Sequence, residues 1–131
     1  MNKIVKTDQE WKSLLTEDEY YVTRQKGTEP PFSGKNFKII NGGIFKCKCC
    51  GNELFNSSTK YDSYCGWPSF FEQISPEAIK TETDRSHGMV RIEIMCAKCD
   101  AHLGHVFDDG PEPTGKRYCV NSLSINYEEF E

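Results

Sequence analysis

The sequence predicts a mainly β domain of antiparallel strands preceded by short N-terminal helices. Three observations lead to this fold class. Apolar residues near the N-terminus follow a helical rhythm, short or alternating apolar segments separated by turn residues follow from residue 37, and 131 residues suit one core. We therefore expect a single domain over residues 1–131, with helices at about 8–25 and a β core at about 37–128.

The composition indicates a globular protein and excludes several classes of partner. Hydrophobic residues make up 37% of the chain and charged residues 27%, and the net charge of −4 argues against a nucleic-acid partner. No apolar segment approaches the roughly 20 residues that span a bilayer, so we expect no membrane partner. The first residues lack the apolar core of a signal peptide, which predicts a cytoplasmic location. Seven cysteines there favour metal binding or thiol chemistry over a disulfide framework.

Two short helices are predicted by capping-box spacing before apolar residues at helical intervals. The helices are expected at about 8–15 and 17–25, with the box pairs Thr7 and Glu10, then Thr16 and Glu19. Pro30 and Pro31 cannot continue a helix, so the helical region ends before them.

The remaining elements are expected to be strands. Two apolar segments flank Asn41-Gly42-Gly43, which predicts a hairpin in residues 37–47. Val90, Ile92 and Ile94 alternate with polar or longer residues, which predicts a strand over 88–96. Further strands are expected within 102–110 and 117–130, and one helical turn over 75–82, beginning at Pro76.

Two CxxC pairs, Cys47 with Cys50 and Cys96 with Cys99, supply four thiolates, which suits one tetrahedral zinc ion. Gly51 and Asp100, which follow the pairs, suit the left-handed backbone of such turns. A closed four-cysteine site leaves no open position, so we expect a structural zinc. The alternative is that the two CxxC pairs are redox motifs, or that they are a few buried thiols without a metal. Cys49 lies one residue off the pattern, and we expect it to be exposed and without a role.

Cys65 and Cys119 remain outside both pairs. If Cys119 lies on a strand, Arg117 and Asn121 share its face, and an arginine beside a thiol favours the thiolate. An unperturbed thiol would be only about 3% ionised at pH 7. The alternative is that Cys119 is a small buried apolar residue.

Two of the three histidines, His102 and His105, follow the second CxxC pair. They could be metal ligands, surface residues, or proton donors for a site around Cys119, with Asp109 as an orienting carboxylate. The sequence alone leaves these readings open.

Five segments in this order resemble the methionine-R-sulfoxide reductase family, type B: GTEPPFSG, CKCCGNELF, KYDSYCGWPSF, RSHGMVRIEIMCAKCDAHLGHVFDDGP and RYCVNSLSINY. The resemblance extends from about residue 8 to residue 127. It implies two antiparallel sheets in a barrel-like domain clipped by one structural zinc on Cys47, Cys50, Cys96 and Cys99. Methionine sulfoxide is reversible by enzymes of this class.

The resemblance also implies roles for the remaining residues. Cys119 matches the family's nucleophile, Cys65 its recycling thiol, and Trp67 the residue that packs on the substrate methyl group. The residues that match positions lining the active site are His102, His105, Asp109, Arg117 and Asn121. His87 lies in a family motif without an implied catalytic role. Tyr64 stands where the family usually has glycine, which predicts a narrower loop before Cys65.

The expected reaction is reduction of methionine-R-sulfoxide, free or in proteins, by a Cys119 thiolate, with His102 or His105 as proton donor. The resulting sulfenic acid would condense with Cys65, and thioredoxin would reduce the disulfide. Two other classes are alternatives: a zinc-ribbon binding module without catalysis, and a zinc hydrolase, which would need an open metal position.

Overall fold

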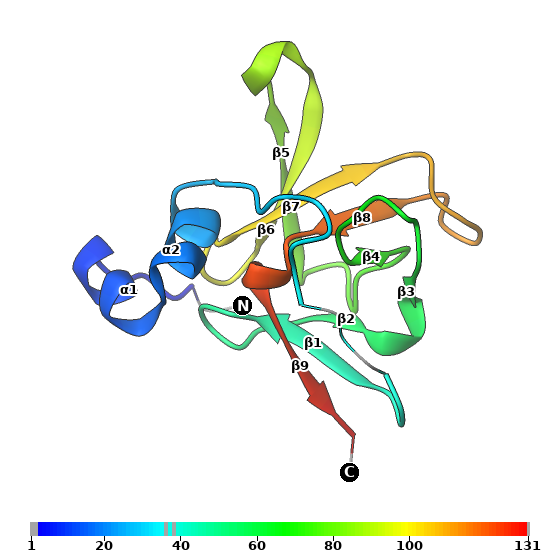
Figure 1. Cartoon of the computed structure of the whole chain (residues 1–131), viewed down its shortest axis with the longest axis horizontal. Helices are drawn as coiled ribbons and strands as arrows, with labels where there is room; N and C mark the ends of the chain where they lie inside the picture. The colour runs from blue at the N-terminus through cyan, green and yellow to red at the C-terminus, as the bar shows by residue number, and fades with distance from the viewer. Residues whose placement is uncertain (1–2, 36, 38, 131) are drawn as a thin grey trace.

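The computed structural model describes residues 3–35, 37 and 39–130, and within them the chain forms two antiparallel β-sheets with two helices at one side (Figure 1). The smaller sheet has the order β2-β1-β9, with β1 at Gly43–Cys47, β2 at Glu53–Asn56 and β9 at Ile125–Glu129. Among the described residues the sheets remain separate and do not close into a barrel. The mainly β, two-sheet fold class is confirmed.

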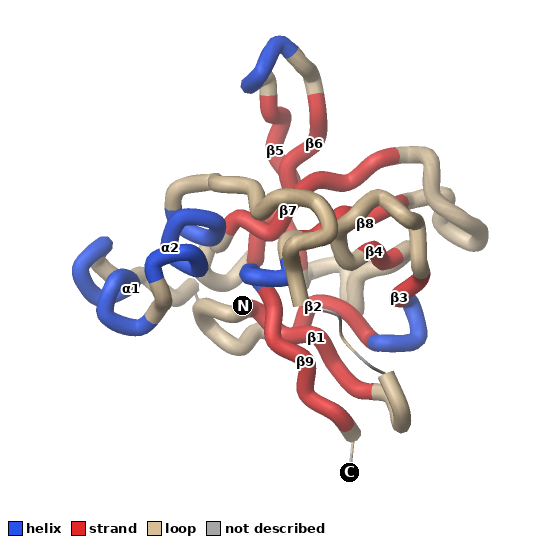
Figure 2. The backbone as a smooth tube through the Cα atoms, viewed as in Figure 1, coloured by secondary structure: helices blue, strands red, loops and turns tan. Residues whose placement is uncertain are grey.

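The larger sheet has six strands in the order β3-β4-β8-β7-β6-β5. Its strands are β3 at Lys60–Tyr61, β4 at Ser69–Phe70, β5 at Ile79–Asp84, β6 at Arg91–Cys96, β7 at His102–Phe107 and β8 at Arg117–Val120. Three 3₁₀ turns join strands: η1 at Ser57–Thr59, η2 at Ser86–Gly88 and η3 at Ser122–Ser124. β5 and β6 extend beyond the body of the molecule as an arm with η2 at its tip (Figure 2).

Both predicted helices are present, α1 at Asp8–Leu14 and α2 at Glu17–Arg24. Each begins at a complete capping box. The threonine hydroxyl accepts from the glutamate N–H at 3.2 Å, and the glutamate carboxylate accepts from the threonine N–H at 3.0 Å. Trp11 is buried, and the Arg24 guanidinium lies 4.4 Å from the centre of its ring. This contact ties α2 to α1.

The hydrophobic core lies between the two sheets. Phe45 and Phe55 of the smaller sheet meet Phe70 of the larger one, and all three are fully buried. Phe55 stacks on Phe70 with ring centres 4.1 Å apart, and Phe45 meets the edge of Phe70 at 5.0 Å. Aromatic packing therefore holds the two sheets against each other.

The hairpin predicted around Asn41-Gly42-Gly43 is wrong. β1 begins at Gly43, but residues 37, 39 and 40 are not in a strand, and residues 36 and 38 lie outside the described residues. The physical reason is that β1 already has two partners: it pairs with β2 along one edge and with β9 along the other. No edge of β1 is left for the preceding segment.

Two further predictions need correction. The strand predicted over 88–96 begins only at Arg91, and Val90 and Ile92 are exposed while Glu93 and Met95 are buried. Ile94 is buried as well, so the expected alternation is absent: the strand is exposed where it begins on the projecting arm and buried on both faces from Glu93 onward. The helical turn predicted over 75–82 is a β-turn in which the Ala78 N–H donates to Ser75 O at 3.2 Å, and β5 follows directly.

The described part of the chain contains no helix that is both long and apolar enough to cross a bilayer.

Candidate active site and metal centre

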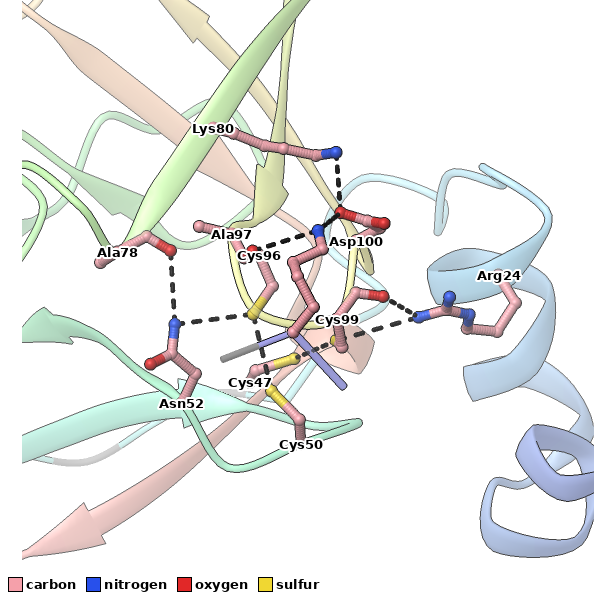
Figure 3. A network of polar contacts seen from close by, with 11 residues as sticks. Arg24, Cys47, Cys50, Asn52, Ala78, Lys80, Cys96, Ala97, Cys99 and Asp100 are labelled. Atoms are coloured by element: carbon pink, nitrogen blue, oxygen red, sulfur yellow. Dashed lines mark hydrogen bonds and ion pairs between the residues drawn. The ribbon is translucent and has the colours of Figure 1, made fainter. Parts of the chain in front are cut away.

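The two CxxC segments form matching turns, one between β1 and β2 and one between β6 and β7. In the first turn the Gly51 N–H donates to Cys47 O at 2.9 Å, and in the second the Asp100 N–H donates to Cys96 O at 2.9 Å. Gly51 has φ +79° and Asp100 has φ +67°, as the left-handed position of these turns requires. Each turn points its two sulfurs toward the other turn (Figure 3).

The four sulfur atoms lie within 4.8 Å of one another and could hold a metal ion. Cys47 Sγ is 3.6 Å from Cys99 Sγ, and Cys50 Sγ is 3.6 Å from Cys96 Sγ. A zinc ion with Zn–S bonds of about 2.3 Å requires sulfur–sulfur edges of about 3.8 Å. The donor set and its spacing therefore fit tetrahedral zinc.

Neighbouring donors support the sulfur cluster, as Figure 3 shows. Asn52 Nδ2 lies 3.6 Å from Cys96 Sγ, and Arg24 Nη1 lies 3.0 Å from Cys99 O and 3.8 Å from Cys99 Sγ. Groups of this kind orient metal ligands. Cys49, which we expected to be exposed, is half-buried and packs against the hydrophobic core.

A separate pocket of about 290 Å³ is lined by β7, β8 and the loop that carries Cys65. Its walls bring together six of the predicted residues, which are Cys65, Trp67, His105, Arg117, Cys119 and Asn121. Sequence reasoning did not assign roles to the other lining residues, which are Thr28, Arg91, Gly104, Phe107 and Val120. Of the predicted site residues, His102 and Asp109 do not line this pocket.

Strand register explains why these residues meet. Neighbouring strands place Glu93 opposite His105, His105 opposite Cys119, Cys119 opposite Ser69, and Ser69 opposite Tyr61. Directly paired residues project from the same face of a sheet. One row of side chains therefore crosses five strands, with Cys119 near its middle.

A β-bulge brings the second histidine to the same face. His102 and His105 are three residues apart, so in a regular strand they would point to opposite faces. The β6–β7 ladder skips Leu103, which makes His102 and Gly104 consecutive partners of β6. His102 Nδ1 consequently reaches the carboxylate of Glu93 at 2.7 Å.

The two unpaired thiols face each other, with Cys65 Sγ 3.8 Å from Cys119 Sγ. Burial, followed by the adjacent Cys65, raises the pKa of Cys119 to about 12, and Arg117 opposes this rise. Burial also raises the pKa of Cys65, but hydrogen bonds from Ser63 and Ser69 lower it by more, so its pKa lies below the ordinary value. The Ser63 hydroxyl lies 3.0 Å from Cys65 Sγ.

Asp109 pairs with Arg117 rather than with a histidine. Arg117 Nε and Nη2 donate to its two carboxylate oxygens at 2.9 and 3.2 Å. The guanidinium also lies 4.3 Å from the centre of the Phe107 ring. Asp109 thus orients Arg117 over the pocket.

Glu29 connects Trp67, Asn121 and the η3 turn, a role that sequence reasoning missed. Its backbone O accepts from Trp67 Nε1 at 2.9 Å, and its N–H donates to Asn121 Oδ1 at 3.0 Å. Its buried carboxylate accepts from the Ser122 hydroxyl and from the Leu123 N–H. Glu29 therefore fixes both the Trp67 ring and the Asn121 amide.

Each histidine has a carboxylate of its own. His105 Nε2 lies 2.8 Å from Asp84 Oδ2, whereas His102 is paired with Glu93, which also lies 3.4 Å from Lys26 Nζ. Burial lowers the pKa of His102, which favours its neutral form. Sequence reasoning gave neither Asp84 nor Glu93 a role, because their contacts with the histidines come from neighbouring strands of the folded sheet.

Tyr64, where the resembled family usually has glycine, has φ +59° and is 81% exposed. The backbone at this position is left-handed, which explains a preference for glycine. Asp62 Oδ1 accepts from the Tyr64 N–H at 2.9 Å and so supports the loop that leads to Cys65.

Comparison with known proteins finds one family over most of the chain. Residues 15–129 match the SelR domain. The chain is 58% identical over 127 residues to a curated "Peptide methionine sulfoxide reductase MsrB" of Hahella chejuensis, covering 97% of this chain and 91% of the relative. It is 56% identical to the protein of the same name from Acinetobacter baylyi, over 131 residues that cover 100% of this chain and 94% of the relative.

The fold also resembles a solved structure of different sequence. The crystal structure of the Mis18 "Yippee-like" domain aligns with a TM-score of 0.55 at 17% identity, and covers 69% of this chain and 98% of that one. At this identity the likeness extends to the fold alone.

Proposed function

The chain belongs to the SelR family, and on this premise we propose that Cys119 reduces methionine-R-sulfoxide and that Cys65 then regenerates it. The activity itself, reduction of methionine sulfoxide, is that of a peptide-methionine (R)-S-oxide reductase. What we propose is the route by which this chain performs it. One observation carries the proposal: two thiols 3.8 Å apart open into one pocket that also holds a histidine and an arginine.

The first step transfers oxygen from the sulfoxide to Cys119. The sulfoxide oxygen leaves sulfur only if it gains a proton, and His105 is the better placed donor because it lines the pocket while His102 is turned to Glu93. The Cys119 thiolate attacks the sulfur of the protonated sulfoxide, and an S–S bond forms while the S–O bond breaks and the oxygen leaves as hydroxide. The hydroxide then attacks Cys119 Sγ, and the S–S bond breaks with its electron pair going to the methionine sulfur. The products are methionine and a Cys119 sulfenic acid, so the substrate gains the two electrons that the thiol loses.

The second step joins the two cysteines. The Cys65 thiolate attacks the Cys119 sulfenic sulfur, the hydroxyl leaves as water after taking up a proton, and a disulfide forms. The low pKa of Cys65 and its distance from Cys119 both favour this attack. Thioredoxin, as a protein dithiol, would then reduce the disulfide by exchange and return both thiols.

Two further parts of the site support substrate recognition. Trp67 lines the pocket with its ring oriented by Glu29, and it would pack against the methyl group on the sulfoxide sulfur. Contact with one substituent would select the R epimer. A zinc ion on the four cysteines would be structural, since it lies outside this pocket and all four positions are thiolates.

The test is a thioredoxin-dependent turnover assay with the two sulfoxide epimers supplied separately in short peptides. We expect the R epimer to be reduced and the S epimer not to be, and Cys119→Ser to abolish reduction because an alcohol cannot replace the thiolate. Oxidation of NADPH through thioredoxin reductase gives the rate. Equal reduction of both epimers would contradict the role of Trp67, and an active Cys119→Ser variant would contradict the nucleophile.

A further inference from the structure

We propose that Asp84 is a positioning residue that holds His105 by Nε2 and leaves Nδ1 as the ring nitrogen that exchanges protons. The inference rests on the proposed function, because it concerns the histidine assigned as proton donor. It also gives a role to the turn at the tip of the β5–β6 arm, which contains His87 and has no contact with the pocket.

The contact is close and shielded from water. Asp84 Oδ2 lies 2.8 Å from His105 Nε2, and the exposed fractions of the two side chains are 18% and 11%. Arg91, which lines the pocket, approaches the same oxygen with Nη2 at 3.4 Å. Asp84 ends β5 and Arg91 begins β6, and the two are register partners. The carboxylate therefore reaches the wall of the pocket across β6.

The other carboxylate oxygen is fixed by the turn. Asp84 Oδ1 accepts from the Ser86 N–H at 2.9 Å, and Ser86 O accepts from the Met89 N–H at 3.1 Å. His87 and Gly88 both have left-handed backbones, with φ +56° and +69°, and these angles close the turn. Since Oδ1 is tied to the turn, Oδ2 keeps a single direction toward His105.

The protonation of the ring follows from the charge on Asp84. The hydrogen bond from His105 lowers the pKa of Asp84 well below its usual range, so the carboxylate is ionised at neutral pH. An ionised carboxylate can only accept a hydrogen bond, and Nε2 must therefore carry a proton in both the neutral and the charged ring. Proton exchange with a sulfoxide oxygen is left to Nδ1.

The competing carboxylates have other partners. Asp109 is held by both donors of Arg117, and Glu93 pairs with His102 and Lys26. The titratable or charged side chains that face His105 from its neighbours are Asp84 of β5, Arg91 and Glu93 of β6, His102 of β7, Arg117 and Cys119 of β8, and Cys65 of the adjoining loop. Only Asp84 among them is hydrogen-bonded to the His105 ring in the described structure.

Single-turnover kinetics of Asp84→Asn test the proposal. We expect the rate of methionine release at pH 7 to fall by about 10²-fold, the lower end of what a positioned general acid contributes. KM should change little, because the carboxylate does not line the pocket. Asp84→Glu, which keeps the charge, should recover part of the rate.

Glu82→Gln is the matched control, because it removes one negative charge from an exposed position on the same strand. It should leave the rate of methionine release at the wild-type value. Equal rates for Asp84→Asn and Glu82→Gln, measured in folded proteins, would overturn the positioning role.

A second measurement does not depend on activity. ¹⁵N NMR of the wild-type imidazole groups should show the Nε2–H tautomer for His105, and this signature should weaken in Asp84→Asn. An Nδ1–H tautomer in the wild-type protein would overturn the proposal. Failure of the wild-type enzyme to reduce the R epimer would instead overturn the proposed function and leave the NMR result unaffected.

Discussion

At the scale of single residues, the two thiols of the pocket, Cys65 and Cys119, differ in how readily they lose a proton. Arg117 lowers the pKa of Cys119, as the sequence predicted, but burial and the neighbouring Cys65 outweigh it and leave the pKa at about 12. Serine hydroxyls instead favour the thiolate of Cys65. Of the two thiols, Cys65 therefore forms the thiolate more readily.

This distribution predicts the order of alkylation. At neutral pH iodoacetamide should modify Cys65 faster than Cys119, because the thiolate is the reactive form. Ser63→Ala should slow modification of Cys65, since it removes the hydroxyl 3.0 Å from the sulfur. Peptide mapping by mass spectrometry after short exposures measures both rates, with the denatured chain as the control in which the difference disappears. Faster modification of Cys119 would contradict the assignment of the more reactive thiolate to Cys65.

At the scale of elements, the bulge in β7 determines the geometry of the site. Gly104, next to the skipped Leu103, lies so close to β8 that a Cβ atom there would be 1.9 Å from Cys119 O. A side chain at this position would push β7 and β8 apart. The strand that carries both histidines and the strand that carries Cys119 are thus in register only because residue 104 is glycine.

Gly104→Ala should therefore lower the free energy of unfolding by about 2–3 kcal/mol, as overpacking of a well-packed site does. Methionine sulfoxide reduction should fall much further, because Cys119 and His105 separate. Gly115→Ala is the control: φ there is +72° but nothing lies within 4 Å, so we expect a cost of only about 1–2 kcal/mol, from the backbone alone, and normal activity. Urea unfolding and turnover are the measurements. A fully active Gly104→Ala protein would contradict this reading of the bulge.

The elements also show how far sequence reasoning extends. Capping boxes and CxxC spacing are local, and both helices and both metal turns were predicted from them. The hairpin before β1 was predicted wrongly, because its outcome depends on β9, some eighty residues later. Asp84 and Glu29 were missed for the same reason. Their partners lie on distant strands and loops, so neither the segment GTEPPFSG around Glu29 nor the strand that ends at Asp84 indicates these contacts.

At the scale of the whole molecule, the cysteine cluster joins the two sheets. Cys47 and Cys50 come from the end of the smaller sheet, and Cys96 and Cys99 from the turn between two strands of the larger one. α2 packs against the same turn through Arg24. A metal ion there would connect the smaller sheet, the larger sheet and α2. Without it, four thiols around one point would leave the sheets joined mainly by the aromatic core.

We therefore predict that Cys96→Ser loses zinc and unfolds at ordinary temperature, whereas Cys49→Ser keeps one zinc per chain and remains folded. Both variants replace one sulfur atom with oxygen. Cys96 is one of the four clustered cysteines, whereas Cys49 lies outside that group although it is adjacent to Cys50 in the sequence. Structural zinc contributes on the order of 10 kcal/mol in small zinc-binding peptides, which is comparable to the whole stability of a domain. Elemental analysis of freshly purified protein and thermal unfolding, with and without a chelator, give both quantities. Wild-type protein that is folded and active without zinc would show that the cluster is a set of buried thiols. Loss of zinc from Cys49→Ser would contradict the predicted set of four zinc ligands.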